Sequence, residues 1–309
     1  MTAILSVADV LAVAPTALCH APSLTRTPDG LLAAWFGGTT EGASDTAIWT
    51  ARHVAGRWLA PQIVMSMARE PCWNPVLMRL AADDLRLYFQ VGDSPLAWRC
   101  MVAASADHGV TWTAARPLSG DASGPVRCRP LRLENGDLLS PSSREQHGWQ
   151  CHVERSGDGG RTWRRIDVPG WPEVAAIQPC LLDHGGGVIQ VLCRTRQGRV
   201  AVSWSQDGGA NWSRLRLSAL ANPDAALDAL RLTDGRLLLA SNPQAGDRTP
   251  LTAAVSHDGI AWHTVLTLAD GPRDHAYPSL AETDDGRVHV VWSIDKARLS
   301  HAVIDPARF

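Results

Sequence analysis

The sequence lacks long apolar runs, lysine and net charge, and each absence excludes a class of function. No stretch approaches the roughly 18 consecutive apolar residues that a transmembrane helix needs. Lys296 is the only lysine among 309 residues, and the formal net charge at pH 7 is −2. The chain therefore carries neither the basic surface typical of nucleic-acid binding nor the lysine-rich patch that anionic membranes attract. We expect no nucleic-acid partner and no membrane partner.

Cysteine and histidine are present, but not in a pattern that holds a metal. The seven cysteines are dispersed without a CxxC pair, and the eleven histidines show no HxH or HExxH spacing. The sequence also lacks an EF-hand loop, a phosphate loop and a dinucleotide fingerprint. We therefore expect no metal and no cofactor, and we interpret the cysteines as buried thiols in a reducing compartment.

The segment MTAILSVADVLAVAPTA at the start of the sequence allows two interpretations. It faintly resembles a secretory signal peptide, but it lacks a basic region and Asp9 interrupts its apolar run. The preferred interpretation is a β-strand that closes a ring with the last part of the chain. On that interpretation we expect a cytoplasmic protein.

Two series of motifs repeat about every fifty residues. The first is Ser-x-Asp-x-Gly-x-x-Trp, which includes a shortened copy and a degenerate one. In such a box the Asp accepts hydrogen bonds from the turn's own backbone, the Gly adopts positive φ and the Trp packs under the hairpin. The tryptophans that end the copies are Trp58, Trp112, Trp163, Trp212 and Trp262, spaced by 54, 51, 49 and 50 residues.

The second series is a tight turn followed by an apolar strand, and it has six copies. They are TPDGLLAAW (27–35), AADDLRLYF (81–89), LENGDLLSP (133–141), DHGGGVIQVL (183–192), LTDGRLLLA (232–240) and ETDDGRVHVVW (282–292). Asp-Gly and Asn-Gly between apolar runs are strong hairpin signals. One such unit cannot cover both faces of its own sheet, whereas six units stacked around an axis can. The sequence therefore predicts an all-β fold, a six-bladed β-propeller with four-stranded antiparallel blades and residues 1–309 in one domain. Residues 224–232, which hint at a helical period, are predicted to be loop and strand.

The box series on a six-fold repeat resembles the sialidase (neuraminidase) superfamily over the whole chain. The resemblance implies three arginines that bind a substrate carboxylate, a tyrosine nucleophile paired with a glutamate, and an aspartate acid/base. Four positions keep the family's residue: Asp45 in GGTTEGASDTAIW, Arg194 in VLCR, Arg248 in DRTPL and Tyr277 in HAYPSL. Two positions depart from it: His20 in CHAPSL replaces an arginine, and Gln178 in AIQP replaces the glutamate.

These residues have a chemical interpretation and a structural one. The two arginines present planar forks of donors suited to a carboxylate, or each pairs with an acidic residue of a neighbouring blade. Tyr277, with an ordinary pKa of about 10, needs a base or nearby cations to act as a nucleophile. Asp45 is a general acid or an Asx-turn residue. His20 is a partial substitute for arginine, a proton carrier, or a hydrogen-bonded histidine at the top of the channel.

Gln178 can hydrogen-bond the phenol of Tyr277 but cannot take its proton. Glu145 or Glu154 can supply the missing carboxylate from an adjacent blade, or both are ordinary rim residues. Three tryptophans outside the boxes are further candidates for the same pocket, either as sugar platforms or as core residues: Trp73, Trp98 and Trp149. Polar residues from blade edges are candidates too: Arg127, Arg129, Ser142, Ser143 and Glu145.

Three functions fit these residues. The leading hypothesis is an exo-α-sialidase-like glycoside hydrolase acting on a terminal acidic sugar, with Tyr277 as nucleophile, Asp45 as acid/base and an arginine clamp for the carboxylate. The second is a lyase that eliminates at a uronate, with Tyr277 and His20 as base and acid. The third is a glycan-binding propeller without catalysis. The expected partner is an acidic glycan in every case, and the sequence predicts no oligomeric state.

Overall fold

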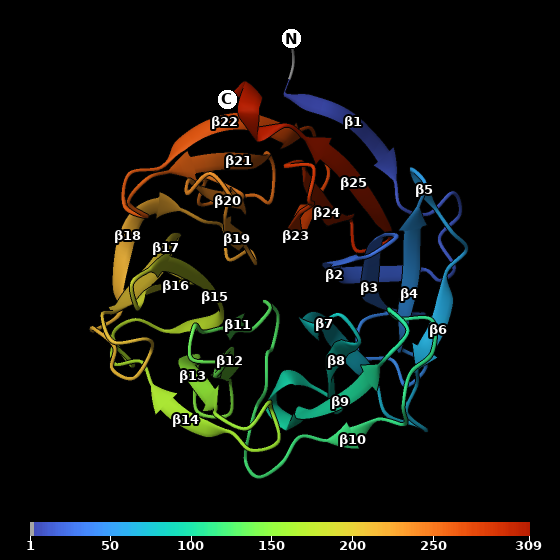
Figure 1. Ribbon diagram of the computed structural model, residues 1–309, viewed down its shortest axis with the longest axis horizontal. Helices are drawn as coiled ribbons and strands as arrows, with labels where there is room; N and C mark the ends of the chain where they lie inside the picture. Colours follow the sequence, from blue (N-terminus) through green and yellow to red (C-terminus); the bar gives the residue numbers. More distant parts are fainter. Residues whose placement is uncertain (1–2) are drawn as a thin grey trace.

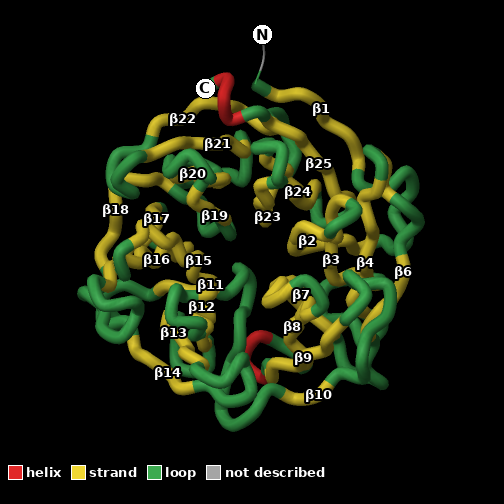
Figure 2. The backbone as a smooth tube through the Cα atoms, in the orientation of Figure 1, coloured by secondary structure: helices red, strands yellow, loops and turns green. Residues whose placement is uncertain are grey.

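The computed structural model describes residues 3–309, which form six antiparallel β-sheets around a central axis (Figure 1). The predicted six-bladed β-propeller is confirmed. Five sheets have four strands each, and the remaining sheet has five because both β5 and β6 pair with β4. Loops connect the strands, and the described residues contain two short 3₁₀ helices, η1 (Pro95–Ala97) and η2 (Pro306–Arg308) (Figure 2). Within residues 3–309 no helix has the length and hydrophobicity required to cross a bilayer.

The blades are numbered here in chain order, with strands given from the axis outward. Blade 1 contains β2 (Leu18–Thr27), β3 (Gly30–Gly38), β4 (Ala47–Val54), β5 (Arg57–Trp58) and β6 (Gln62–Met65). Blade 2 contains β7 (Cys72–Ala81), β8 (Asp84–Val91), β9 (Arg99–Ser105) and β10 (Arg116–Pro117). Blade 3 contains β11 (Leu131–Arg132), β12 (Leu138–Arg144), β13 (Gln150–Ser156) and β14 (Arg164–Asp167).

The second half of the ring follows the same order. Blade 4 contains β15 (Ala176–Gly185), β16 (Val188–Thr195), β17 (Arg199–Ser205) and β18 (Arg216–Ala221). Blade 5 contains β19 (Asp228–Arg231), β20 (Leu237–Ser241), β21 (Leu251–Ser256) and β22 (His263–Ala269). Blade 6 contains β23 (His275–Glu282), β24 (Val288–Ile294), β25 (Arg298–Ile304) and β1 (Ile4–Asp9). Strand β1 pairs antiparallel with β25, from Ile4 opposite Ile304 to Asp9 opposite Ser300.

The Asp boxes form the local turns that their sequence indicates. In the copy after β9, Ser105 Oγ accepts a hydrogen bond from Gly109 N at 2.8 Å, and Asp107 Oδ1 accepts one from Thr111 N at 2.8 Å. The copies after β13, β17 and β21 repeat the serine bond at 2.8 to 2.9 Å. The boxes therefore stabilise turns, at the strand ends opposite to those where the inner strands begin.

Four blades begin their inner strand with the same unusual turn, a residue at positive φ followed by proline. The register shifts directly after each of these residues, as in a β-bulge, and a bulge re-aims the side chain that it carries. Non-glycine residues adopt positive φ at a cost of about 1–3 kcal/mol, so the surrounding structure must impose it. We call these positions the mouth turns: Ala21 (φ 50°), Asn74 (φ 40°), Gln178 (φ 52°) and Tyr277 (φ 58°).

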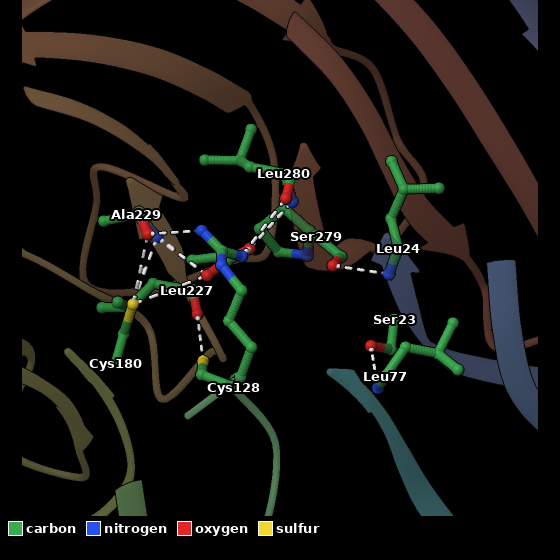
Figure 3. A network of polar contacts seen from close by, with 12 residues as sticks. Ser23, Leu24, Leu77, Cys128, Cys180, Leu227, Ala229, Ser279 and Leu280 are labelled. Atoms are coloured by element: carbon green, nitrogen blue, oxygen red, sulfur yellow. Dashed lines mark hydrogen bonds and ion pairs between the residues drawn. The ribbon is translucent and has the colours of Figure 1, made fainter. Parts of the chain in front are cut away.

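Just past the mouth turns, side chains on the inner strands connect neighbouring blades (Figure 3). Each accepts a hydrogen bond from a backbone N–H of the next blade, at distances between 2.8 and 3.3 Å. The bonds pair Ser23 with Leu77 N, Cys180 with Ala229 N, Asp228 with Leu280 N, and Ser279 with Leu24 N. We call the four acceptors, Ser23, Cys180, Asp228 and Ser279, the channel ring.

Arg129 compensates for the short inner strand of blade 3. Its guanidinium forms an ion pair with Asp228 at 2.9 Å and donates to the carbonyl oxygens of Ala229 at 3.1 Å and Leu280 at 3.2 Å. Blade 3 is thereby connected across the channel to blades 5 and 6. This contact extends the channel ring and holds a charged pair whose carboxylate is almost completely buried.

Candidate active site

A cavity of about 190 Å³ lies at the end of the ring where the inner strands begin. Seven of the residues predicted for the pocket line it: Trp73, Trp98, Glu145, Trp149, Gln178, Arg194 and Tyr277. The other lining residues are Glu41, Asn74, Pro95, Ile177 and Arg196. The lining comes from five of the six blades, so residues far apart in sequence meet at one mouth of the ring.

Tyr277 lies at the base of this cavity, on a mouth turn of β23, and is 8% exposed. Its hydroxyl oxygen accepts a hydrogen bond from Arg194 Nη1 at 2.9 Å. Burial by itself raises the pKa of Tyr277, but the charges of Arg194 and Arg248 and a hydrogen bond with Gln178 outweigh it, so the net effect lowers the pKa below its ordinary value of 10. The phenol is therefore activated by cations rather than by a carboxylate base.

Arg194 forms hydrogen bonds and an ion pair with three neighbouring side chains. Its Nη1 donates to Gln178 Oε1 at 3.0 Å as well as to Tyr277, while Nε and Nη2 contact Asp224 Oδ1 at 2.8 and 2.7 Å. A carboxylate of the protein thus occupies the Nε/Nη2 side of this guanidinium. The structural interpretation of Arg194, pairing with an acidic residue, therefore applies, and its binding of a substrate carboxylate stays a prediction.

His20 packs against Tyr277, with the two ring centroids 4.3 Å apart. Burial and then the charges of Lys296, Arg248, Arg127 and Arg194 lower the pKa of His20 well below 6.5, so the imidazole is neutral. Its Nδ1 lies 2.8 Å from Ser293 Oγ, and that hydroxyl donates to Ala276 O at 3.0 Å. The hydroxyl proton is thus used, so Nδ1 carries the imidazole proton and Nε2 remains an acceptor. A neutral imidazole does not replace the positive charge of an arginine.

Arg248 and Arg127 lie next to Tyr277 without lining the cavity. The guanidinium carbons of Arg248 and Arg127 are 5.9 and 5.4 Å from the centroid of the tyrosine ring. Arg248 Nη2 donates to Asp224 O at 2.9 Å, and Arg127 Nη2 donates to Pro278 O at 2.5 Å. Arg248 therefore lowers the pKa of the phenol through its charge, whereas Arg127 contacts the face of the tyrosine ring, and neither belongs to the cavity lining.

At the rim beside Arg194, Trp149 stacks on Arg196, a residue that the sequence did not indicate. The guanidinium carbon of Arg196 is 4.2 Å from the ring centroid of Trp149, and that of Arg194 is 5.3 Å from it. The Trp149 indole Nε1 donates to Glu145 Oε2 at 3.0 Å. Arg196 is 73% exposed, so its donors face solvent and the cavity.

Three tryptophans outside the boxes, Trp73, Trp98 and Trp149, line the cavity, and their role as sugar platforms stays a prediction. Trp73 is 6% exposed, donates to Gly92 O at 2.8 Å and packs against Phe36 and Trp98, yet one part of it lines the cavity. Trp98 and Trp149 also line the cavity. The mouth thus has an aromatic wall on one side and charged side chains on the other, as carbohydrate sites with apolar and polar faces do.

Asp45, the predicted acid/base, lies outside the cavity lining. Both of its carboxylate oxygens accept hydrogen bonds from Thr39 N at 3.1 Å, and the Thr39 hydroxyl also donates to Asp45. These bonds lower the pKa of the exposed carboxyl and are those of a loop-stabilising turn residue. The acidic residue of this loop that does line the cavity is Glu41, which is ion-paired with Lys296.

Some of the residues at the mouth were missed from the sequence. Asn74 carried a signal, because Asn74-Pro75 repeats the pattern of Gln178-Pro179 and Tyr277-Pro278 at the start of an inner strand. Asp224 and Arg196 carried none, since they lie in loops without a repeated motif. Of the other predicted residues, Glu154 is buried and binds Ser123 N and Gly124 N at 2.7 and 2.9 Å.

Among residues 3–309, one group of three side chains has the spacing of metal ligands: Cys128, Cys180 and Asp228, with ligand atoms within 4.8 Å of one another. A hydrogen bond with Cys128, and then burial, raise the pKa of the Cys180 thiol well above 9.0. Asp228 is already paired with Arg129. The group therefore fits a hydrogen-bond network between blades better than a cation site.

Comparison with known proteins identifies one family and several similar folds. Residues 29–290 match the family described as BNR repeat-like domain. The fold is similar to that of the Hadza microbial sialidase Hz136, at 17% identity and a TM-score of 0.82, over 95% of this chain and 67% of that chain. A protein of unknown function from Dyadobacter fermentans is similar at 17% identity and a TM-score of 0.79, over 98% of this chain and 100% of that chain.

The NanB sialidase from Streptococcus pneumoniae is similar at 11% identity and a TM-score of 0.76, over 99% of this chain and 71% of that chain. At these identities the structural likenesses concern the fold. No curated protein matches the chain in sequence.

Proposed function

The chain belongs to the BNR repeat-like domain family, and from that premise we propose that it is a sialidase-like glycoside hydrolase that removes a terminal acidic sugar from a glycan. The observation that carries the proposal is Tyr277, a buried phenol at the base of the cavity whose pKa is lowered by Arg194 and Arg248. A tyrosine is the nucleophile in sialidases, which are exceptions to the usual pair of carboxylates in glycosidases.

The surroundings of Tyr277 replace the missing glutamate by electrostatics. Its oxygen attacks the anomeric carbon, and the negative charge that it needs for this is stabilised by the Nη1 donor of Arg194 at 2.9 Å. Gln178 has no acidic proton to exchange, so it orients Arg194 and the phenol without acting as a base.

Arg196 supports the acidic character of the substrate. Arg194 contacts Asp224, Gln178 and Tyr277 with four of its five N–H donors, whereas Arg196, which also lines the cavity, is 73% exposed and lies 4.0 Å from Asp224 Oδ2. Its stacking on Trp149 fixes the guanidinium plane at the rim. We assign Arg196 to the carboxylate of the sugar and Trp73 and Trp98 to its apolar face.

An elimination at a uronate is the second candidate, and the neutral His20 favours it. The imidazole packs against Tyr277 with an Nε2 acceptor, so the pair can supply a base and an acid without any carboxylate. The arginines would then stabilise the charge that develops when the proton next to the carboxylate is removed.

Product analysis separates these functions. Acidic oligosaccharides incubated with the protein should release a free sugar, whereas a lyase gives an unsaturated product with new ultraviolet absorbance, and a binding protein gives neither. Tyr277→Phe should lower turnover by about 10³-fold or more, as loss of a nucleophile does, with an unchanged melting temperature. Turnover that survives this substitution would contradict the proposal.

A further inference from the structure

Two acidic side chains line the cavity, and they differ in how they are paired. Glu41 is held by the ammonium group of Lys296. Glu145 has no ion pair among residues 3–309, and its Oε2 accepts a hydrogen bond from the neutral indole of Trp149. Glu145 is therefore the carboxylate of the cavity lining that has no cationic partner among the described residues, and its Oε1 remains open to a ligand.

The position of Glu145 is set by a rigid support. It directly follows β12, and Trp149, which is 8% exposed, fixes Oε2 at 3.0 Å while stacking against Arg194 and Arg196. Glu145 comes from blade 3 and Tyr277 from blade 6, so the cavity has the two groups on separate blades of the ring. A glycosidase needs such a separation, because the sugar must fit between the nucleophile and the proton donor.

The electrostatic environments of the two groups are opposite. Burial raises the pKa of Glu145, and neither the Trp149 hydrogen bond nor the charges of Arg194 and Arg196 reverse this. The pKa of Tyr277 in the same cavity is lowered. The raised pKa of Glu145 favours its protonated form and the lowered pKa of Tyr277 favours its ionised form, which are the forms that a general acid and a nucleophile need.

We propose that Glu145 is the proton donor of the glycosidase reaction described above, on which this inference rests. In the first step Tyr277, as the phenolate, bonds through Oη to the anomeric carbon, the glycosidic C–O bond breaks, and the Glu145 proton moves to the leaving oxygen, which departs as an alcohol. In the second step Glu145 takes a proton from water, the resulting hydroxyl bonds to the anomeric carbon, and the tyrosine departs as phenolate. The sum is hydrolysis, with both side chains restored.

The test compares leaving groups that need a proton with leaving groups that do not. Glu145→Gln should lower kcat/KM on an alkyl glycoside of the acidic sugar by about 10²-fold or more, as loss of a general acid does. On a nitrophenyl glycoside the same variant should form the glycosyl–tyrosine normally and then accumulate it, because water is no longer deprotonated. Azide, which needs no base, should restore turnover and give the glycosyl azide.

Matched substitutions separate this inference from the proposed function. Glu134→Gln makes the same change at an exposed turn on the other face, and Asp45→Asn tests the residue expected from the sequence. Both should affect alkyl and nitrophenyl glycosides equally. If Asp45→Asn shows the leaving-group dependence and azide rescue while Glu145→Gln does not, the inference is overturned and the proposed function stands. If the wild type hydrolyses no acidic glycoside, the proposed function is overturned, and the role of Glu145 with it.

Discussion

In blades 1, 4 and 6 the mouth turn and the channel-ring residue lie two residues apart along the inner strand, yet the polar groups at the mouth and in the ring are paired in different ways. In the channel ring every acceptor binds a backbone N–H of the next blade, and the charge of Asp228 is balanced by Arg129. At the mouth, Tyr277 and Glu145 have shifted pKa values, and Glu145 keeps an oxygen for a ligand. The side chains of the channel ring hydrogen-bond the next blade and hold the blades together, whereas Glu145 at the mouth keeps an oxygen that can bind a ligand.

The mouth turns also show how one backbone feature serves different ends. The same positive-φ residue before proline carries Ala21, Asn74, Gln178 and Tyr277 in four blades. Because the bulge is common to all four, the fold does not depend on which side chain occupies it. Blade 6 can therefore carry Tyr277 at this position, and blade 4 can carry Gln178, whose amide oxygen accepts a hydrogen bond from Arg194.

The largest effect on stability is expected in the channel ring. Asp228→Ala should lower the free energy of unfolding by about 3 kcal/mol, because Leu280 N loses its buried acceptor and the partly exposed guanidinium of Arg129 loses its counterion. Chemical denaturation measures this loss, and the activity of the folded fraction should be retained because Asp228 does not line the cavity. A loss below about 1 kcal/mol would mean that Arg129 finds another partner and that the ring does not depend on the pair.

The next effect concerns charge at the mouth. Arg194→Met should raise the pKa of Tyr277, because burial is then opposed by fewer cations. The ultraviolet absorbance of tyrosinate reports this residue alone below pH 10, since the other tyrosine, Tyr88, is buried and its pKa is raised well above 10. Activity should shift to higher pH in parallel.

Arg196→Met is the control for that titration, because Arg196 is exposed and is not among the main causes of the Tyr277 shift. The folded pKa of Tyr277 lies below its unfolded value of about 10. Its ionisation therefore stabilises the fold above pH 10, and this contribution is lost as the pH falls through the folded pKa. An unchanged tyrosinate titration in Arg194→Met would show that the mouth does not activate the phenol.

The smallest effect is expected for a single uncharged bond of the ring. Ser279→Ala removes the acceptor of Leu24 N and should cost about 1–3 kcal/mol, since that buried N–H then has no partner. Ser300→Ala is the matched control, because its hydroxyl makes one long contact of 3.4 Å to Ala8 O. Thermal unfolding should give a clearly lower melting temperature for Ser279→Ala than for Ser300→Ala. Equal melting temperatures would show that this bond of the channel ring contributes no more to stability than the long contact of Ser300.

The fold was predictable because its signals are local. Each Asp box fixes its own turn through bonds within about four residues, and each Asp-Gly or Asn-Gly turn fixes one hairpin, so neither depends on the rest of the chain. Repetition then determined the number of blades. The convergence of Gln178, Arg194 and Tyr277 was also predictable, since they occupy equivalent ends of strands in a ring.

The pairing within the mouth was not predictable from the sequence. Asp224 reaches Arg194 from the loop between β18 and β19, and Arg196 stacks on a tryptophan of another blade. No motif encodes such contacts, because they depend on how loops of different blades meet. For the same reason the sequence favoured Asp45 on resemblance, whereas the burial and partners of Glu145 became visible only in three dimensions.

The bond from Leu24 N to Ser279 Oγ joins residues 255 positions apart, and it links the sixth blade to the first. Closing a loop of that length costs more conformational entropy than any contact within a hairpin, so the seam is expected to form late, together with the pairing of β1 and β25 and after the hairpins have folded. Once formed, it ties the blades into a closed circle, and a blade can detach only after the circle opens. The slow step that delays assembly should therefore also lengthen the lifetime of the native state.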